Sequence, residues 1–444
     1  MPGGSQQAQS RGQVDAPQGN RLSYWQQHAG AMAGLPPSDP PGDADVVVIG
    51  GGLAGLATAI AILQRQPGIR VVVLEAQFVG FGASGRNGGL LSPLPAPVWL
   101  LTTKTNADHA WATHALNAKV HALGAWLDKT LPDSEVRTCK LQLQAMGRLT
   151  TSGVAKVAEA LAHAGIGYGL GPDPQRGGKP TLELPTFTVH PYRLVRALAA
   201  HAMTLGARIC EHTAVAAVEG VPGGALVRLA GGRQVRAGKL VICTNAYTGS
   251  IAVLSPPRAK VVRNYMIATE PLDAETVQRL GGGGTFMVEL NKSYVFYRLH
   301  QGRLVYGGIE TFFRTPESDF EVPASIHKAL ERHLAKSIPW RANLPIAVEW
   351  GGAFHSTATD LPIIQRAADA GSIVFNIGYG GTGVALTNIF AAHAAAMALD
   401  LPLPDEDARL GEIVRGTGVP IKGLLRLGAG VAWDVAKGLV RGRA

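Results

Sequence analysis

Cysteine is scarce in this chain: its 444 residues include three, Cys139, Cys210 and Cys243. They are isolated, so the sequence has no C-x-x-C pair and no cysteine–histidine group with the spacing of a zinc site. We therefore expect no metal site. The same pattern is typical of a reducing compartment, and we expect a cytoplasmic protein.

Long apolar runs are also missing. No stretch reaches the roughly 18 residues that a membrane-spanning helix needs. Residues 1–20 are polar and rich in glutamine, without the apolar segment of a signal peptide. Charged residues make up 16% of the chain and hydrophobic residues 46%, so a large core can form and global disorder is excluded.

Basic charge is not concentrated in the way that nucleic-acid binding requires. The chain has 41 basic and 32 acidic residues, a net charge of +9. This excess favours anionic surfaces or substrates in a general way. No basic run is interleaved with aromatic residues, so we do not expect nucleic-acid binding.

What the chain does contain is a strand–glycine–helix unit. Residues 45–49 form an apolar run that predicts a short strand, and Gly50, Gly52 and Gly55 follow with the spacing G-x-G-x-x-G. The first glycine permits a tight turn, the second lets the backbone approach a pyrophosphate, and the third lets the helix pack on the strand. The helix that begins near Leu53 would direct its N-terminal N–H groups at the phosphates.

A second strand completes the unit. Residues 71–74 are rich in β-branched side chains and are followed by Glu75, whose carboxylate can accept hydrogen bonds from both hydroxyls of a ribose. Strand, turn, helix, strand and terminal carboxylate in this order predict a dinucleotide-binding site. The alternative is a glycine-rich turn in an ordinary βαβ unit.

The next segment favours FAD over NAD as the dinucleotide. Residues 80–89 read Gly-Phe-Gly-Ala-Ser-Gly-Arg-Asn-Gly-Gly. Here the sequence resembles the FAD-dependent amine oxidoreductases of the D-amino-acid-oxidase superfamily, most of all the γ-glutamylputrescine oxidase branch. In that family the loop runs beside the pyrophosphate and leads the chain under the flavin ring. The alternative is a flexible polar loop. The resemblance covers about residues 23–399.

The motifs and the resemblance predict an α/β (α+β overall) protein. We expect a Rossmann-like FAD-binding domain and a second substrate domain built on a mostly antiparallel sheet. The expected parts are a disordered lead over 1–42, the FAD-binding domain over 43–95, 186–254 and 346–402, the substrate domain over 96–185 and 255–345, and a C-terminal basic tail over 403–444. Within the lead, residues 23–25 are either a small anchoring arm or part of a tail without contacts.

The resemblance implies that FAD contacts both glycine-rich junctions, the 80–89 loop and the ends of several strands. The second junction, residues 378–383, precedes a predicted helix over 384–399 whose N-terminus could face the flavin's pyrimidine edge; the alternative is a simple packing helix. The implied FAD-binding residues are Gly50, Gly52, Leu53, Ala54, Gly55, Glu75, Ala76, Ala83, Ser84, Arg86, Asn87, Gly88, Gly89, Val215, Asn245, Gly378, Tyr379, Gly381, Thr382 and Gly383.

The resemblance also implies the chemistry. A hydride moves from the carbon of an amine or amino acid to flavin N5, the resulting imine is hydrolysed, and oxygen or another acceptor takes the electrons. Candidate substrate-site residues are Tyr294, Tyr297, Arg298 and His355, because aromatic rings could enclose an alkyl amine and an arginine could pair with a carboxylate. Tyr294 and Tyr297 are an odd number of positions apart, so a regular strand turns them to opposite faces. His355 has the alternative role of a structural histidine.

Two residues of the sarcosine-oxidase branch are absent. That branch carries a lysine near flavin N5 that promotes the reaction with oxygen, and residues 304–307 contain none, which predicts a slow reaction with oxygen. Arg263, Lys292, Arg298 or a protonated His355 could replace it. The branch also carries a cysteine bonded to the flavin, and residues 349–365 contain none, which predicts non-covalent FAD.

The sequence is therefore interpreted as an FAD-dependent amine or amino-acid oxidoreductase. The enzymatic alternative is an NAD-linked dehydrogenase. The other alternative is a non-catalytic flavin-binding or membrane-associated interaction protein, because residues 420–444 combine an apolar stripe with a basic face that could lie on an anionic membrane or on a partner.

Overall fold

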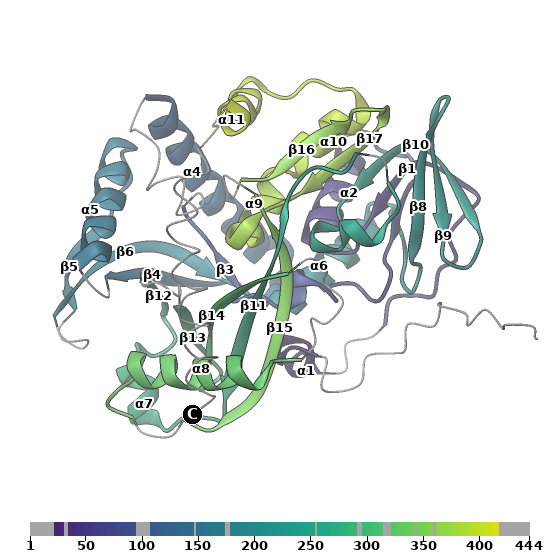
Figure 1. The fold of residues 1–444 in the computed structure, drawn as a ribbon. Coiled ribbons are helices and arrows are strands. Elements are labelled where there is room, and N and C mark those ends of the chain that lie inside the picture. The colour runs from purple at the N-terminus through teal and green to yellow at the C-terminus, as the bar shows by residue number, and fades with distance from the viewer. Residues whose placement is uncertain are drawn as a thin grey trace, which may run out of the picture.

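A computed structural model describes the chain over residues 22–30, 34–94, 107–145, 148–173, 178–253, 255–290, 295–313, 321–341, 344–357 and 361–416. In these ranges the chain forms two sheets, with helices packed against both (Figure 1). The C-terminal tail that the sequence singles out, residues 420–444, and Tyr294 lie outside the described residues.

The first sheet has the order β16-β17-β10-β1-β2-β7, with β8 and β9 attached beside β10. Its strands are β1 (Asp43–Ile49), β2 (Val71–Leu74), β7 (Arg208–Cys210), β8 (Val215–Val221), β9 (Gly224–Leu229), β10 (Gln234–Ile242), β16 (Ile363–Ala367) and β17 (Ala370–Ile377). The central strands β17, β10, β1, β2 and β7 are parallel, while β16, β8 and β9 join antiparallel. The expected Rossmann-like architecture is confirmed.

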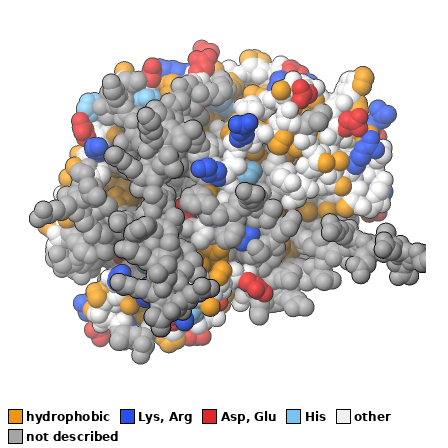
Figure 2. All heavy atoms as spheres, viewed as in Figure 1, with side chains coloured by type: hydrophobic (Ala, Val, Ile, Leu, Met, Phe, Trp, Pro, Cys, Tyr) orange, Lys and Arg blue, Asp and Glu red, His pale blue; other side chains and the backbone are white. Residues whose placement is uncertain are grey.

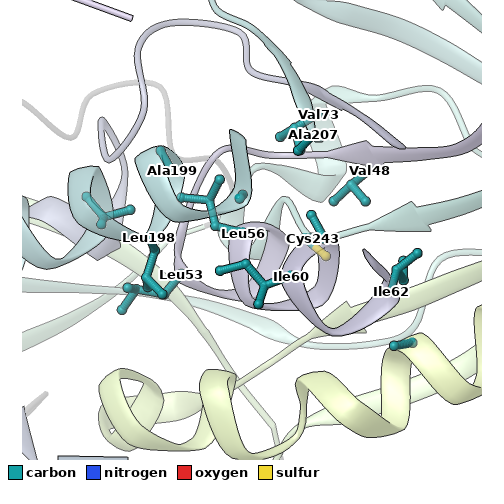
Figure 3. Packing of buried hydrophobic residues seen from close by; sticks show 14 of the residues in the cluster. Val48, Leu53, Leu56, Ile60, Ile62, Val73, Leu198, Ala199, Ala207 and Cys243 are labelled. Carbon is teal, nitrogen blue, oxygen red and sulfur yellow. The ribbon is translucent and has the colours of Figure 1, made fainter. Parts of the chain in front are cut away.

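Both faces of this sheet are covered, which explains its nearly continuous apolar strands. Val46 and Val48 of β1 face a helical layer formed by α2 (Leu53–Arg65), α6 (Pro191–Thr204) and α10 (Ala391–Leu399). Figure 3 shows this packing, with Leu56 and Ile60 of α2 among the side chains between sheet and helices. The alternate residues of β1 face the β8–β9 side. Burial of each such side chain stabilises the fold by roughly 1.5–3 kcal/mol.

The second sheet has the order β15-β11-β14-β13-β12-β4-β6-β3, with β5 paired to β6. Its strands are β3 (Leu90–Leu91), β4 (Arg137–Ala145), β5 (Gly169–Asp173), β6 (Lys179–Thr188), β11 (Lys260–Thr269), β12 (Thr285–Leu290), β13 (Val295–His300), β14 (Arg303–Phe313) and β15 (Ile346–Ser356). All its pairs are antiparallel except β12 with β4. The expected mostly antiparallel second sheet is confirmed.

Helices pack on both faces of the second sheet. They are α4 (Ala107–Thr130) and α5 (Arg148–His163) beside β4 and β6, α7 (Ala274–Arg279) and α8 (Ala324–Ser337) beside β13 and β14, and α11 (Asp405–Gly416) against α4. The boundary expected at residue 346 is corrected, because β15 belongs to the second sheet and pairs with β11. The chain rejoins the first sheet only at β16.

The disordered lead expected over residues 1–42 is corrected at residues 23–28, where the alternative of a small anchoring arm is confirmed. Residues 24–28 form a short helix, α1 (Tyr24–His28), with a capping box between Ser23 and Gln26. Trp25 is 0% exposed and Tyr24 is 4% exposed. Helix α1 lies against α6 and β15, between the two sheets (Figure 1). The arm is therefore part of the folded unit.

The long C-terminal helix expected over 384–399 is broken. It forms α9 (Gly383–Ile389) and α10, which meet at Phe390 with a bend of 58°. Among the described residues no single helix has the length and apolar character to cross a membrane. The bent pair α9 and α10 reaches that length and apolar character only when the two helices are taken together. On the described part of the face in Figure 2, basic and acidic side chains are interspersed.

Candidate active site

The first glycine turn has the geometry that its spacing predicts. Gly50 has φ +108°, a conformation that side chains rarely adopt, and a Cβ there would lie 2.9 Å from the carbonyl oxygen of Cys243. A Cβ at Gly55 would lie 2.0 Å from the Gly50 carbonyl oxygen, so α2 can approach β1 only without a side chain. Gly52 is the N-cap of α2. The turn thus presents the N-terminus of α2 at the ends of the parallel strands.

Glu75 stands at the end of β2. Its carboxylate accepts the N–H of Gly51 at 2.7 Å and the N–H of Gln77 at 2.9 Å. Burial raises the pKa of this carboxyl, and the two N–H bonds oppose that shift. A carboxylate has about four acceptor positions, so it can hold these bonds and still accept ribose hydroxyls.

A cleft with a volume of about 570 Å³ opens over these groups. Ten of the predicted cofactor residues line it: Gly50, Gly52, Ala54, Glu75, Ala76, Ala83, Ser84, Val215, Asn245 and Tyr379. It follows the carboxyl ends of the parallel strands, where α/β sheets bind dinucleotides. The positive-φ turn, the helix N-terminus and the carboxylate fit an FAD whose adenosine half lies in this cleft.

The loop at residues 80–89 is held by internal bonds. Ser84 Oγ accepts the N–H of Leu53 at 2.9 Å, which ties the loop to the first turn of α2. Asn87 donates to the carbonyls of Ala83 and Ser84 and accepts the N–H of Gly89. These bonds give the loop one conformation beside the cleft.

Arg86 is the charged member of this loop. It is 3% exposed, and its guanidinium donates to the carbonyls of Phe81 at 2.8 Å and Gly351 at 3.1 Å. The backbone carbonyl of Arg86 accepts the indole N–H of Trp350 at 2.8 Å. Arg86 therefore links the loop to β15 of the second sheet.

The second glycine junction meets the cleft through Asn245. The side-chain oxygen of Asn245 accepts the N–H of Gly378 at 3.2 Å and the N–H of His355 at 3.3 Å. The ends of β10, β15 and β17 therefore meet at this residue. Thr382 is buried where α9 begins, and Gly378, Thr382 and Gly55 line neither of the two cavities described here.

A second cavity, of about 180 Å³, lies between the loop, the start of α9 and the second sheet. It shares Ala83, Ser84, Asn245 and Thr387 with the cleft, so the two are continuous. Further predicted cofactor residues line it: Leu53, Arg86, Asn87, Gly88, Gly89, Gly381 and Gly383. The second sheet contributes Asn264, Met266, Phe286, Val288, Phe296, Glu310, Gly352 and Phe354.

The wall from the second sheet is apolar and aromatic with two polar groups, Asn264 and Glu310. The side-chain oxygen of Asn264 is buried without a hydrogen-bond partner. Glu310 faces the cavity because the pairing of β14 with β11 shifts between Gly307 and Ile309, at Gly308 with φ +130°. Tyr306 and Ile309 both pack toward α8 across this bulge, so the next residue turns to the cavity.

Tyr297 is not at this cavity, and the expectation that it contacts substrate is corrected. It is 2% exposed and packs on the α8 side of the sheet, stacked on Tyr306 with ring centroids 5.6 Å apart. Its hydroxyl donates to Glu289 at 3.3 Å. On β13 the cavity-facing residue is its neighbour Phe296, because successive strand residues alternate between faces.

Arg298 and His355 also lie outside the two cavities. The guanidinium of Arg298 donates to the carbonyl of Val189 at 2.9 Å and lies 4.8 Å from the Trp25 ring centre. Its contacts are therefore with the backbone and with the arm, away from both cavities. Burial lowers the pKa of His355 to about 4, so it is neutral near pH 7. The expected carboxylate-pairing role of Arg298 and the cationic role of His355 are therefore corrected.

The residues of the second sheet that line the cavity were not predicted from the sequence. Alternation in β12 carries a signal for Phe286 and Val288, which are two positions apart, and alternation in β13 places Phe296 on the face opposite to Tyr297. Glu310 had a weaker signal: a lone carboxylate in an apolar strand, two positions after a pair of glycines.

A dinucleotide cradle at the ends of a parallel sheet, continuous with a cavity under an antiparallel sheet, defines a two-domain flavin-dependent oxidoreductase. The chain matches the family described as DAO, FAD dependent oxidoreductase, over residues 45–397, and it belongs to that family.

Curated relatives agree with this family. The chain is 26% identical to a probable oxidoreductase OrdL of Rhizobium meliloti over 371 residues, covering 80% of this chain and 83% of the relative. It is 27% identical to the γ-glutamylputrescine oxidoreductase of Escherichia coli over 363 residues, covering 78% and 81%. Among solved structures, glycine oxidase from Geobacillus kaustophilus shares the fold with a TM-score of 0.69 at 18% identity, covering 82% of this chain and 96% of that chain.

Proposed function

We propose that this protein oxidises the C–N bond of a cationic amine, with FAD as the hydride acceptor. When bound, FAD supplies the redox chemistry, and the resulting imine is hydrolysed by water. The residues of the chain bind the cofactor, orient the amine and hold the proton that it loses. The name of the Escherichia coli relative, γ-glutamylputrescine oxidoreductase, supports an amine as the substrate class.

The observation that carries this proposal is the composition of the second cavity. Its wall from the second sheet is apolar and aromatic, with the carboxylate of Glu310 and the amide oxygen of Asn264 as its polar groups. Carboxylate and amide oxygens accept N–H bonds from an ammonium. Phe286, Phe296 and Phe354 suit the alkyl part of the amine.

The same cavity fits a simple amine better than an amino acid. Arg86 is the one arginine or lysine among the described residues that line it, and its guanidinium donates to the Phe81 and Gly351 carbonyls. A substrate carboxylate would compete with these bonds. Glu310 also offers an acceptor for the proton that an ammonium must lose before its carbon is oxidised.

We infer that FAD is held without a covalent bond and that the protein works in a reducing, cytoplasmic setting. Cys139, Cys210 and Cys243 are free and buried. Burial raises the pKa of Cys139 and of Cys243 to about 12, which opposes formation of the reactive thiolate. Among the three, only Cys243 lines the cleft, and none lines the second cavity. Flavin that stays with acid-precipitated protein would refute the non-covalent attachment.

The proposed function is tested by the visible spectrum of the holoenzyme under anaerobic conditions. We expect primary and secondary alkyl amines to bleach the flavin absorbance, and matched amino acids and 2-hydroxy acids to do so at least tenfold more slowly. Bleaching by hydroxy acids alone would replace the C–N assignment. Flavin absorbance that stays unchanged with every amine would favour a non-catalytic flavin-binding protein. A spectrum without flavin would favour an NAD-linked enzyme.

A further inference from the structure

Three histidines far apart in the sequence meet beside the arm. His28 ends α1, His190 is the N-cap of α6 and His300 ends β13. One ring nitrogen of each lies within 4.8 Å of those of the other two. The ring centres of His28 and His300 are 4.9 Å apart, and those of His190 and His300 are 5.5 Å apart. His190 and His300 are 1% and 8% exposed.

Two ring nitrogens of this group are buried without a hydrogen-bond partner, Nδ1 of His28 and Nε2 of His190. The opposite nitrogen of His28 lies 2.8 Å from the side-chain oxygen of Gln301. Nδ1 of His300 lies 2.9 Å from the hydroxyl of Tyr24, which leaves its Nε2 for the centre of the group. Ligating histidines are oriented in this way, by a partner on the nitrogen that does not bind the metal.

A carboxylate completes the group. Glu135 Oε2 lies 3.5 Å from Nε2 of His300, and Glu135 Oε1 pairs with Arg193 at 3.0 Å. A cleft lined by Glu135, His190 and His300 provides a path for an ion from solvent.

We propose that His28, His190 and His300, with Glu135 as fourth ligand, bind one divalent transition-metal ion of the zinc class. Three imidazoles and a carboxylate are a donor set that zinc accepts in tetrahedral geometry. Ligand atoms about 2.0–2.2 Å from such an ion are roughly 3.3 Å apart. The ring nitrogens lie within 4.8 Å of one another, so they approach by up to about 1.5 Å on binding. A metal on Nε2 of His190 places the ring proton on Nδ1, and the weak 3.3 Å bond from the Arg193 N–H is given up.

The position of the site gives the ion a structural role. His28 belongs to the arm, His190 to a helix of the first sheet's layer, and His300 to the second sheet. The arm also holds the loop at residues 80–89, called the flavin loop below. Trp25 donates to the Asn87 carbonyl at 2.7 Å, and Gln26 donates to the Gly80 carbonyl at 3.0 Å. A bound ion therefore fastens the arm across the two sheets and braces the loop.

The test is metal binding by the flavin-loaded chain without a polyhistidine tag. After treatment with a chelator and dialysis, Zn²⁺ is titrated in competition with a chromogenic chelator, and Co²⁺ is titrated separately for its absorption to the red of the flavin bands. We expect one ion per chain with a micromolar or lower Kd, cobalt bands of tetrahedral type, and a higher Tm with zinc than without.

Two variants separate this site from incidental binding. His28→Gln should weaken zinc binding at least 100-fold and abolish the zinc-dependent rise in Tm, while keeping the fold because His28 is half-buried at the end of a short helix. His163→Gln, an exposed histidine on α5, should bind zinc as the wild type does. Wild-type binding below 0.1 ion per chain, or equal binding by His28→Gln, would show that the three rings surround water only and would overturn the proposal.

Discussion

At the scale of single residues, Glu310 has the most direct consequence for substrate choice. It is the carboxylate among the described residues that line the second cavity, and a shift of pairing in β14 turns it there. A charge-assisted hydrogen bond contributes about 1.5–3 kcal/mol. In the proposed function, recognition of the substrate ammonium therefore depends mainly on this side chain.

We predict that Glu310→Gln raises KM for an alkyl amine by roughly 10- to 100-fold, because the amide keeps the shape and loses the charge. Steady-state kinetics measure this, with FAD content determined in parallel. Glu275→Gln, on the exposed surface of α7, is the matched control and should leave KM unchanged. An unchanged KM in Glu310→Gln would place the ammonium elsewhere.

Residues 304–307 lack the lysine that promotes the reaction with oxygen in the sarcosine-oxidase branch. Val305 is 1% exposed and packs in a cluster with Tyr24 and Trp25, so no cation reaches the cavity from there. Of the expected replacements, Arg298 and His355 are excluded above, Lys292 lies outside the described residues, and Arg263 lines neither cavity. Among the described residues that line the second cavity, Arg86 is the one cation.

We predict a slow reaction of the reduced holoenzyme with oxygen, slowed about a further tenfold or more by Arg86→Met. The reason is that a cation stabilises the superoxide formed in the first electron transfer. Stopped-flow mixing with oxygen measures the rate, and Arg86→Lys should restore part of it. Reoxidation as fast as amine turnover would contradict the slow reaction with oxygen. An unaltered rate in Arg86→Met would contradict the role of Arg86.

His355 carries a pH dependence of stability. Burial lowers its pKa in the folded state to about 4 from an ordinary value of 6.5. The unfolded chain then binds the proton more readily than the folded chain. The stability that the protein has while the buried ring is neutral is therefore fully present above pH 6.5 and is lost as the pH falls toward 4. The full effect is about 3 kcal/mol, at about 1.36 kcal/mol for each unit of pKa.

We predict that the difference in unfolding free energy between wild type and His355→Gln shrinks by up to about 3 kcal/mol from pH 7 to pH 4. Groups that titrate in both proteins cancel in this difference. Urea unfolding at several pH values measures it. Parallel curves of unfolding free energy against pH for the two proteins would show that protonation of the buried ring does not destabilise the fold.

At the scale of elements, the two glycine junctions place two helices against the cofactor site. Glycine at position 52 is required by contact, because a Cβ there would lie 2.8 Å from Ser84 Oγ. Ser84 Oγ in turn accepts the N–H of Leu53, so the loop and the start of α2 move together. A side chain at position 52 would separate them and fill the path of a pyrophosphate.

We predict that Gly52→Val is isolated with less than about a tenth of the wild-type FAD, because the added side chain blocks the phosphate cradle. The ratio of flavin to protein absorbance measures this. Gly34→Val is the matched control: a Cβ at Gly34 meets no atom within 4 Å, so its FAD content should be normal. Full occupancy in Gly52→Val would mean that FAD binds elsewhere.

At the scale of the whole molecule, the arm connects the two sheets and the flavin loop. Trp25 is fully buried, donates to the Asn87 carbonyl and lies under the guanidinium of Arg298. Ser23 Oγ donates to the Gly85 carbonyl at 2.7 Å. The arm therefore couples global stability to the conformation of the loop.

We predict that Trp25→Ala lowers the unfolding free energy by about 3–5 kcal/mol and weakens FAD binding, because a large buried ring and the brace of the loop are lost together. Denaturant unfolding and FAD titration of the apoprotein measure the two effects. Trp126→Ala, a half-buried tryptophan on α4, should cost less stability and keep FAD affinity. Normal FAD affinity in Trp25→Ala would show that the arm does not influence FAD binding.

The sequence by itself determined the first sheet, the dinucleotide cradle and the family. Gly50, Gly52, Gly55 and Glu75 act through backbone conformation and through neighbours within one βαβ unit, so their spacing contains the information. The break at Phe390 and the helix in the arm were not visible, because they depend on the surfaces that these segments meet.

Only the tertiary structure decided which side chains of the second sheet face the cavity. The shift of pairing at Gly308 selects Glu310, strand alternation selects Phe296 over Tyr297, and the buried arm takes Arg298 away from substrate. The meeting of three histidines beside the arm is of the same kind. Contacts between residues hundreds of positions apart depend on strand register and on how elements pack, and local spacing contains neither.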